Sequence, residues 1–234
     1  MVHCDILFDI NRNALTLEKL SKAMDGFQES YKEAMHYTIR NSEVLDNNGK
    51  VFVDCAARLL SSFKMTRRGP FKGVGIAQDG HIENEEILRD CWCAVKKPLL
   101  DIRDSISART QAGYSRDRYL LQLSQLEREE LVAQIWSMTK DLLPLTMGET
   151  SYGLVGASKI LFAVLPEIVL PLDNRQWLRV FRTVDLGDVI RWMVLEIQEW
   201  ESTTQRKLNE ADSTGRLTTL PSVYNVMAMH ARPQ

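Results

Sequence analysis

The spacing of apolar residues along this chain follows a helical period. Intervals of three and four residues separate them far more often than intervals of two, which predicts a mostly helical protein. A heptad-like seam runs from Leu17 to Thr38 despite Gly26, and it predicts one long helix or two helices in line. Its members are Leu17, Leu20, Met24, Phe27, Tyr31, Ala34 and Thr38. Asn47-Asn48-Gly49 breaks the pattern, and a new helix is predicted over Lys50–Phe63.

Helix start and stop signals divide the rest of the chain. Pro98 is predicted to end or kink a helix, because proline lacks the N–H that a helix interior uses. Ser124 and Glu127 are spaced as a capping box that starts a helix ending near Pro144, and Pro221 suits the first turn of a last short helix. The fold class is therefore all-α, a compact multi-helix domain over residues 1–234. Its predicted core includes Trp177, Phe181, Ile190, Met193, Val194 and Ile197.

Residues 64–84 interrupt the helical pattern. Glycine, proline and basic residues replace the apolar period there, which predicts a long, flexible connection within the domain. Asp79-Gly80 is a turn signal between Ile76 and Ile82, so one small β-hairpin is predicted near residues 74–82.

Composition limits the classes of function. The chain has 234 residues, of which 44% are hydrophobic and 26% charged, and its formal net charge is −2. This charge gives no global attraction to polyanions, so a nucleic-acid contact has to be a local patch. The apolar run Ile160–Leu172 contains Glu167 and two prolines and is too short to span a bilayer. The N-terminal stretch carries Asp5 within its apolar run, unlike a secretory signal. We therefore expect no membrane partner and a cytoplasmic location.

Metal and cofactor chemistry find no support in the sequence. Four cysteines are too few for a disulfide framework, and Cys91 and Cys93 point to different sides of a predicted helix. The histidines are scattered without ligand spacing, and no nucleotide-binding glycine loop or hydrolase motif occurs. No metal and no cofactor is predicted.

The segment Gly153–Val184 carries the most informative local pattern. Asp173 follows a proline and is a natural N-cap for the next helix. Helical spacing places Trp177, Val180, Phe181 and Val184 on one face and Arg175, Arg179 and Arg182 on the opposite face. The arginine face is either an ordinary solvated surface or a phosphate-contacting one, since guanidinium groups suit bidentate phosphate contacts.

Upstream of that helix, Gly153 and Gly156 bracket a predicted turn. The turn leads into a helix expected to begin close to Lys159, and exposed amides at such a start can hold a phosphate. Lys159 is either a surface lysine or a reactive one, and Asp173 is either only a cap or also a functional carboxylate. A lysine with a lowered pKa can attack a sugar carbon, and a carboxylate can stabilise cationic character there.

The run Val155-Gly156, Lys159 and Asp173 resembles the hairpin-to-aspartate segment of the helix-hairpin-helix DNA glycosylases, an all-α family. The resemblance is confined to residues 153–184. It implies that hairpin amides around Gly156 grip the DNA backbone and that Asp173 assists loss of a base. It also implies that Lys159 forms a Schiff base if the protein has lyase activity.

Two hypotheses from different classes follow. The first is a DNA-binding helical protein with a base-excision activity, in which Lys159 and Asp173 are catalytic. Its DNA contacts would be Gly156, Arg175, Arg179 and Arg182, with Arg67 and Arg68 of the basic connection as a second phosphate clamp. The second is a non-enzymatic interaction module whose seam from Leu17 to Thr38 mediates either self-association, as a homodimer, or the binding of another partner.

Overall fold

The computed structural model describes residues 5–148 and 153–230. The α-helices are α1 (Leu17–Asp25), α2 (Glu29–Asn41), α3 (Lys50–Ser62), α4 (Glu86–Gln111), α5 (Tyr119–Gln122), α6 (Gln125–Thr146), α7 (Leu154–Phe162), α8 (Leu186–Thr204) and α9 (Leu220–His230). Short 3₁₀ turns form η1 (Met65–Arg67), η2 (Arg116–Arg118) and η4 (Leu208–Ala211), and η3 (Gln176–Phe181) is a π-helix. Strands β1 (Gly75–Ile76) and β2 (Ile82–Glu83) form one antiparallel hairpin with Ile76 opposite Ile82. The all-α fold and its small hairpin are confirmed.

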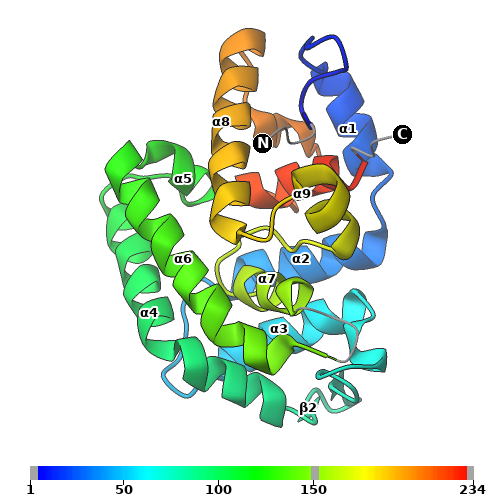
Figure 1. Ribbon diagram of the computed structural model, residues 1–234, viewed down its shortest axis with the longest axis vertical. Coiled ribbons are helices and arrows are strands. Elements are labelled where there is room, and N and C mark those ends of the chain that lie inside the picture. Colours follow the sequence, from blue (N-terminus) through cyan, green and yellow to red (C-terminus); the bar gives the residue numbers. More distant parts are fainter. Residues whose placement is uncertain (1–4, 149–152, 231–234) are drawn as a thin grey trace.

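Helix α7 lies in the middle of the molecule. Figure 1 shows it between α6 and α3, and it packs against both. The long helices α4 and α6 lie side by side, and α6 also packs against α8. The apolar faces meet in one core, which includes all six predicted residues from Trp177 to Ile197 at 3% exposure or less.

The predicted seam forms two helices rather than one. Helix α1 ends at Asp25 and α2 begins at Glu29, and the two pack against different partners: α1 on α9 and η4, and α2 on α3. Leu20, Met24 and Phe27 are buried in the chain's own core. These side chains are therefore covered within the chain, whereas Leu17 and Tyr31 of the seam are only partly buried. The seam as a dimer interface stays a prediction.

Pro98 does not end its helix, which was one of the two predicted outcomes, and the other, a kink, stays a prediction. Helix α4 runs from Glu86 to Gln111 with Pro98 inside it. Val95 and Leu99, on either side of the proline, are fully buried, and α4 packs along α6. This tertiary packing outweighs the loss of one helical hydrogen bond. None of the helices in the described residues has the length and apolar character needed to cross a membrane.

The capping box at Ser124 is confirmed. The Ser124 Oγ accepts a hydrogen bond from the Glu127 amide at 3.4 Å, and Glu127 Oε2 accepts one from the Ser124 amide at 2.8 Å. Both amides precede the first helical hydrogen bonds of α6 and would otherwise lack partners.

The connection over residues 64–84 contains more structure than its composition predicts. It forms η1 and the β-hairpin, and it buries Phe71 and Val74 at 1% and 3% exposure. Strand β1 packs against α3. These two side chains attach the connection to the core, and its predicted flexibility stays a prediction.

Candidate functional site

Helix α7 begins at Leu154, well before Lys159, and not close to the lysine as predicted. Gly153 is its N-cap with a φ of 81°, a conformation that glycine adopts without strain. The first helical hydrogen bond runs from the Ala157 amide to the Gly153 carbonyl at 2.9 Å. Lys159 therefore lies in the interior of the helix, away from the amides at its start.

Gly156 is buried in the first turn of α7. A Cβ atom at this position would lie 2.9 Å from Thr146 Cβ and 3.0 Å from Phe71 Cε2. Glycine therefore permits the close approach of α7 to the end of α6. Val155 and Gly156 are helical and do not form the predicted turn, and the link from α6 to α7 lies partly outside the described residues. A phosphate contact by the Gly156 amide stays a prediction.

The Lys159 side chain is enclosed by the protein. It is 2% exposed, and its Nζ donates a hydrogen bond to the Leu172 carbonyl at 2.8 Å. The same nitrogen lies 4.6 Å from the centroid of the Phe63 ring, a cation–π distance. Burial lowers the pKa of Lys159 to about 8, and the charge of Asp173 opposes this shift. Lys159 is therefore not the surface lysine that the sequence allowed.

Asp173 caps the helix that continues as η3, as predicted. Its Oδ1 accepts a hydrogen bond from the Gln176 amide at 2.8 Å, and Gln176 Oε1 accepts one from the Asp173 amide at 2.7 Å. Asp173 also acts on Lys159 through its charge, although the lysine is hydrogen-bonded to Leu172. The structure thus brings the two predicted catalytic residues near one another, from α7 and from the start of the next helix.

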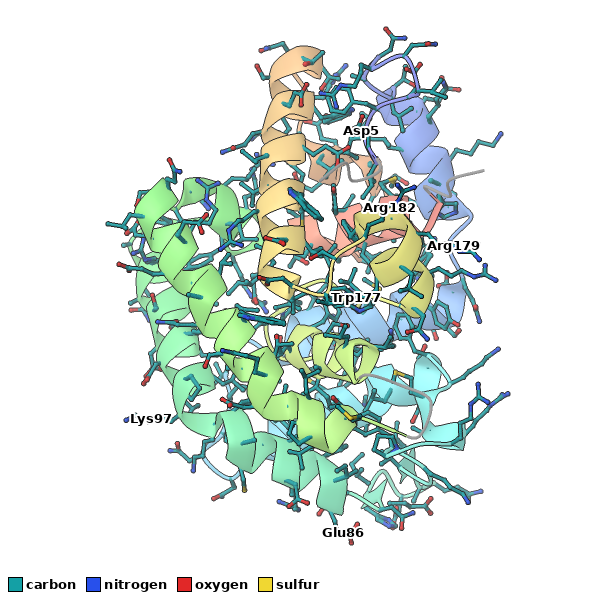
Figure 2. All side chains as sticks on the ribbon, in the orientation of Figure 1. Asp5, Glu86, Lys97, Trp177, Arg179 and Arg182 are labelled. Carbon is teal, nitrogen blue, oxygen red and sulfur yellow. The ribbon has the colours of Figure 1, made fainter. Side chains whose placement is uncertain are left out.

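The helix after Asp173 has the two faces that its sequence predicts. Trp177, Val180 and Phe181 are buried, and the three arginines at 175, 179 and 182 are exposed. Figure 2 shows Arg179 and Arg182 on the same helix as Trp177, whose side chain lies in the interior.

Val184 is the exception to the predicted apolar face. It is 63% exposed, because the helix ends at Phe181 and Arg182 adopts a left-handed conformation with a φ of 52°. The wider π-helical turn also changes which residues share a face. Val184 therefore lies beyond the end of the helix, and helical spacing does not predict its burial.

The exposed arginines differ from the other arginines of the protein. Most arginines in residues 5–148 and 153–230 form ion pairs with carboxylates. These are Arg12, Arg58, Arg89, Arg103, Arg109, Arg116, Arg118, Arg191, Arg206 and Arg216. Among the same described residues, Arg67, Arg68, Arg175, Arg179 and Arg182 form neither an ion pair nor a hydrogen bond through their side chains. Arg40 is likewise without a side-chain partner within the described ranges, and Arg128 donates to the Leu123 carbonyl.

A cleft of about 740 Å³ lies between the η1 turn and the N-terminal ends of α7 and η3. Lys64 and Arg68 form its basic side, and Asn174 contributes from the start of the helix that leads into η3. Met65, Pro70, Phe71 and Val155 give it an apolar lining. Among the described residues that line the cleft, none is acidic.

Lys159 lies directly behind this cleft. Val155 lines the cleft, and Lys159 is one turn further along the same face of α7. The Lys159 ammonium contacts Phe63 and Leu172, and these residues precede Lys64 and Asn174 at the cleft wall by one and two positions. A third cation is therefore close to the cleft but covered by protein.

Of the predicted site residues, Arg68 alone is among the described residues that line this cleft. Lys159, Asp173 and Arg179 are absent from the described lining of the cleft, and the arginine face lies beyond it along η3. Sequence reasoning missed Asn174 and the Leu172 carbonyl. The sequence could not indicate the Leu172 carbonyl, because every residue has a backbone carbonyl. Only the fold determines which carbonyl lies next to Lys159.

In the described residues, no three side chains of His, Cys, Asp or Glu lie close enough together to bind a metal ion. No protein-family model matches the chain, and no curated protein or solved structure matches it either.

Proposed function

We propose that this protein binds DNA through two groups of unpaired arginines, one at the η1 side of the cleft and one beyond the cleft along η3. The first group is Arg67 and Arg68, next to Lys64. The second is the arginine face of η3, formed by Arg175, Arg179 and Arg182. The proposal depends chiefly on one observation, that these five guanidinium groups have no protein partner in the described residues while most other arginines are ion-paired.

Unpaired and exposed guanidinium groups favour phosphate as the partner. A planar guanidinium donates paired hydrogen bonds to phosphate oxygens, and an arginine already bonded to a carboxylate has fewer donors free. The net charge of −2 makes this local concentration more informative, because general basicity does not explain it. The absence of acidic residues from the described cleft lining also suits a polyanion.

The geometry supports base excision less directly, through Asp173. This half-buried carboxylate precedes Asn174, which lines the cleft, and an apolar lining is able to receive an unstacked base. The lysine-dependent version has less support. A Schiff base requires contact between the Lys159 amine and the sugar, and this amine is covered by Phe63 and Leu172. We therefore propose a glycosylase activity without lyase activity as the second candidate.

DNA binding is tested by the fluorescence anisotropy of a labelled duplex at a series of salt concentrations. The wild-type protein is expected to bind with an affinity that falls steeply with salt. Replacement of Arg179 and Arg182 by alanine should reduce the slope of log K against log salt by about one unit per lost contact. Binding that is absent, or unchanged by salt and by these substitutions, rejects the proposal.

Lys97→Ala is the matched control. Lys97 is an exposed cation of the same sign on α4, and Figure 2 shows it on the opposite side of the molecule from Arg179. Its loss changes the net charge by the same amount as one arginine substitution. An equal effect of Lys97→Ala and Arg179→Ala would indicate a nonspecific charge effect and not a defined face.

Base excision is tested with a panel of duplexes that contain damaged or mispaired bases. Base release that persists in Lys159→Met and is lost in Asp173→Asn supports the proposed activity. A borohydride-trapped adduct that depends on Lys159 would instead support the lyase version. If no base is released and no DNA is bound, the interaction module remains, and size-exclusion chromatography with light scattering then measures self-association.

A further inference from the structure

The segment between α7 and η3 is buried without regular secondary structure. Val169, Leu170 and Leu172 are fully buried in this segment, where turn hydrogen bonds satisfy the Leu165 and Leu170 carbonyls. Arg103 holds its first part by donating to the Val164 carbonyl and pairing with Glu167. Its last part, next to η3, needs a different anchor.

Two consecutive residues of α7 supply that anchor. Lys159 Nζ donates to the Leu172 carbonyl at 2.8 Å, and Ser158 Oγ donates to the same oxygen at 3.3 Å. Lys159 provides the shorter and charge-assisted bond, which is the stronger kind. A neutral donor would satisfy a buried carbonyl without the desolvation that a charged ammonium undergoes, so carbonyl satisfaction alone does not explain a lysine here.

The anchored carbonyl leads directly into the arginine helix. Leu172 precedes Asp173, which exchanges two hydrogen bonds with Gln176. Gln176 Nε2 then donates to Asn225 Oδ1 of α9 at 2.8 Å. A continuous polar chain therefore runs from α7 through the start of η3 to α9. The carboxylate of Asp173 interacts electrostatically with the Lys159 ammonium, so the charge of the lysine acts on the cap of the helix that continues as η3.

We propose that Lys159 is a positioning residue, which fixes the start of the arginine helix by holding the Leu172 carbonyl beside the Asp173 cap. Through this contact it sets the direction of Asn174 at the cleft and of the exposed arginines beyond it. The functional consequence rests on the proposed DNA binding. The positioning itself is measurable without DNA.

Amide hydrogen exchange followed by mass spectrometry tests the positioning. In Lys159→Met, which keeps the length of the side chain and removes the charge, exchange over residues 173–182 is expected to be about tenfold faster or more. Exchange in α4 and α8 should be unchanged. Ser158→Ala is the matched control, since it removes the longer, neutral bond to the same carbonyl together with a contact to the Val155 carbonyl inside α7, and its effect on residues 173–182 should be clearly smaller.

The pH dependence of the wild-type protein supplies a second test, in which the step of the wild type is measurable even if the variant does not fold. Burial places the Lys159 pKa at about 8, so the bond to Leu172 loses its charge as the pH rises through this value. Amide exchange is itself catalysed by hydroxide, so the measured rates are divided by the intrinsic rates at each pH. The corrected exchange rate over residues 173–182 is expected to rise as the pH passes through about 8. The step should disappear in Lys159→Met.

The outcomes separate the two proposals. Faster exchange confined to residues 173–182, together with the pH step, supports positioning even if the wild-type protein binds no DNA. Exchange that rises equally throughout the protein indicates a merely structural lysine and overturns the inference. Unchanged exchange and no pH step overturn it as well. If DNA does bind, Lys159→Met should lower its affinity severalfold, and Ser158→Ala should leave it near the wild-type value.

Discussion

Arg103 of α4 and Glu167 form an ion pair inside the core, with Arg103 Nη2 2.8 Å from Glu167 Oε2 and side-chain exposures of 4% and 0%. Arg103 also donates to the Val164 carbonyl, and Arg116 of η2 contacts the same carboxylate. The pair joins a long helix to the buried segment between α7 and η3. Two arginines around one carboxylate satisfy the charges that burial would otherwise leave without partners.

Removal of one charge from this buried ion pair should lower the stability of the folded protein. Glu167→Gln leaves the Arg103 guanidinium buried without its counter-charge, so we expect a loss of about 3–5 kcal/mol in the free energy of unfolding. Urea denaturation measures it. Arg206→Ala is the control, because the Arg206–Glu210 pair is exposed at 63% and 42% and its atoms are 3.8 Å apart. That variant should differ little from the wild type.

The same carboxylate should make the protein sensitive to acid. Burial acts to raise the pKa of Glu167, but Arg103 and Arg116 more than offset this and hold it below its ordinary value. The folded state therefore binds fewer protons than the unfolded state in this range. The stabilisation from Glu167 is fully present above the unfolded carboxyl pKa of about 4.3 and is lost as the pH falls through the lower folded value.

Urea denaturation at a series of acidic pH values measures this dependence. Glu167→Gln has no proton to bind at this position, so its stability should fall less steeply with acid than that of the wild type. Parallel curves for the two proteins would contradict the assignment to Glu167.

Glu196 of α8 binds the segment around Ile6 and Leu7 to the core through hydrogen bonds. It accepts hydrogen bonds from the amides of Ile6 and Leu7 at 2.5 and 2.6 Å and from the Tyr224 hydroxyl at 2.5 Å. Glu196→Ala leaves two buried backbone amides without this acceptor and removes the bond from the Tyr224 hydroxyl, and we expect it to lose about 3 kcal/mol or more of stability. Glu196→Gln keeps an acceptor oxygen for the two amides, and its loss should be smaller.

The pH dependence of Glu196 has the opposite sign to that of Glu167. Burial raises the pKa of Glu196, and the hydrogen bonds from Tyr224, Leu7 and Ile6 only partly oppose this shift. Its contribution to stability is therefore greatest below the unfolded pKa and is lost as the pH rises through the folded value. The stability of Glu196→Gln relative to the wild type should accordingly rise from acidic to neutral pH in urea denaturation. A constant difference would count against this assignment.

Gly156 tests the packing between α7 and α6. Gly156→Ala adds a methyl group within 3.0 Å of Thr146 and Phe71, so overpacking should exceed the gain in helix propensity and destabilise the protein by about 1–3 kcal/mol. Gly26→Ala is the control, since a Cβ there meets its nearest atom, the Lys22 carbonyl oxygen, at an ordinary 3.5 Å. Thermal unfolding should show a lower midpoint for the first variant and little change for the second.

Local sequence determined the features that depend on neighbouring residues. The capping box at Ser124, the cap at Asp173 and the two faces of the arginine helix follow from side chains within a few positions of one another. Helical periodicity gave the all-α class for the same reason, because residues three and four apart share a face in any helix. The hairpin at Asp79-Gly80 follows from the conformational freedom of one turn.

Tertiary structure decided which side chains are covered. Helix α4 continues through Pro98 because buried neighbours hold it against α6, and Leu20, Met24 and Phe27 of the apolar seam are buried by packing of α1 on α9 and η4 and of α2 on α3. Lys159 is the clearest case, since its position on α7 followed from helical periodicity but its partners Phe63 and Leu172 come from distant segments. The pKa of this lysine depends on burial by those segments. Burial is a sum over contacts that are remote in sequence, so no local pattern encodes it.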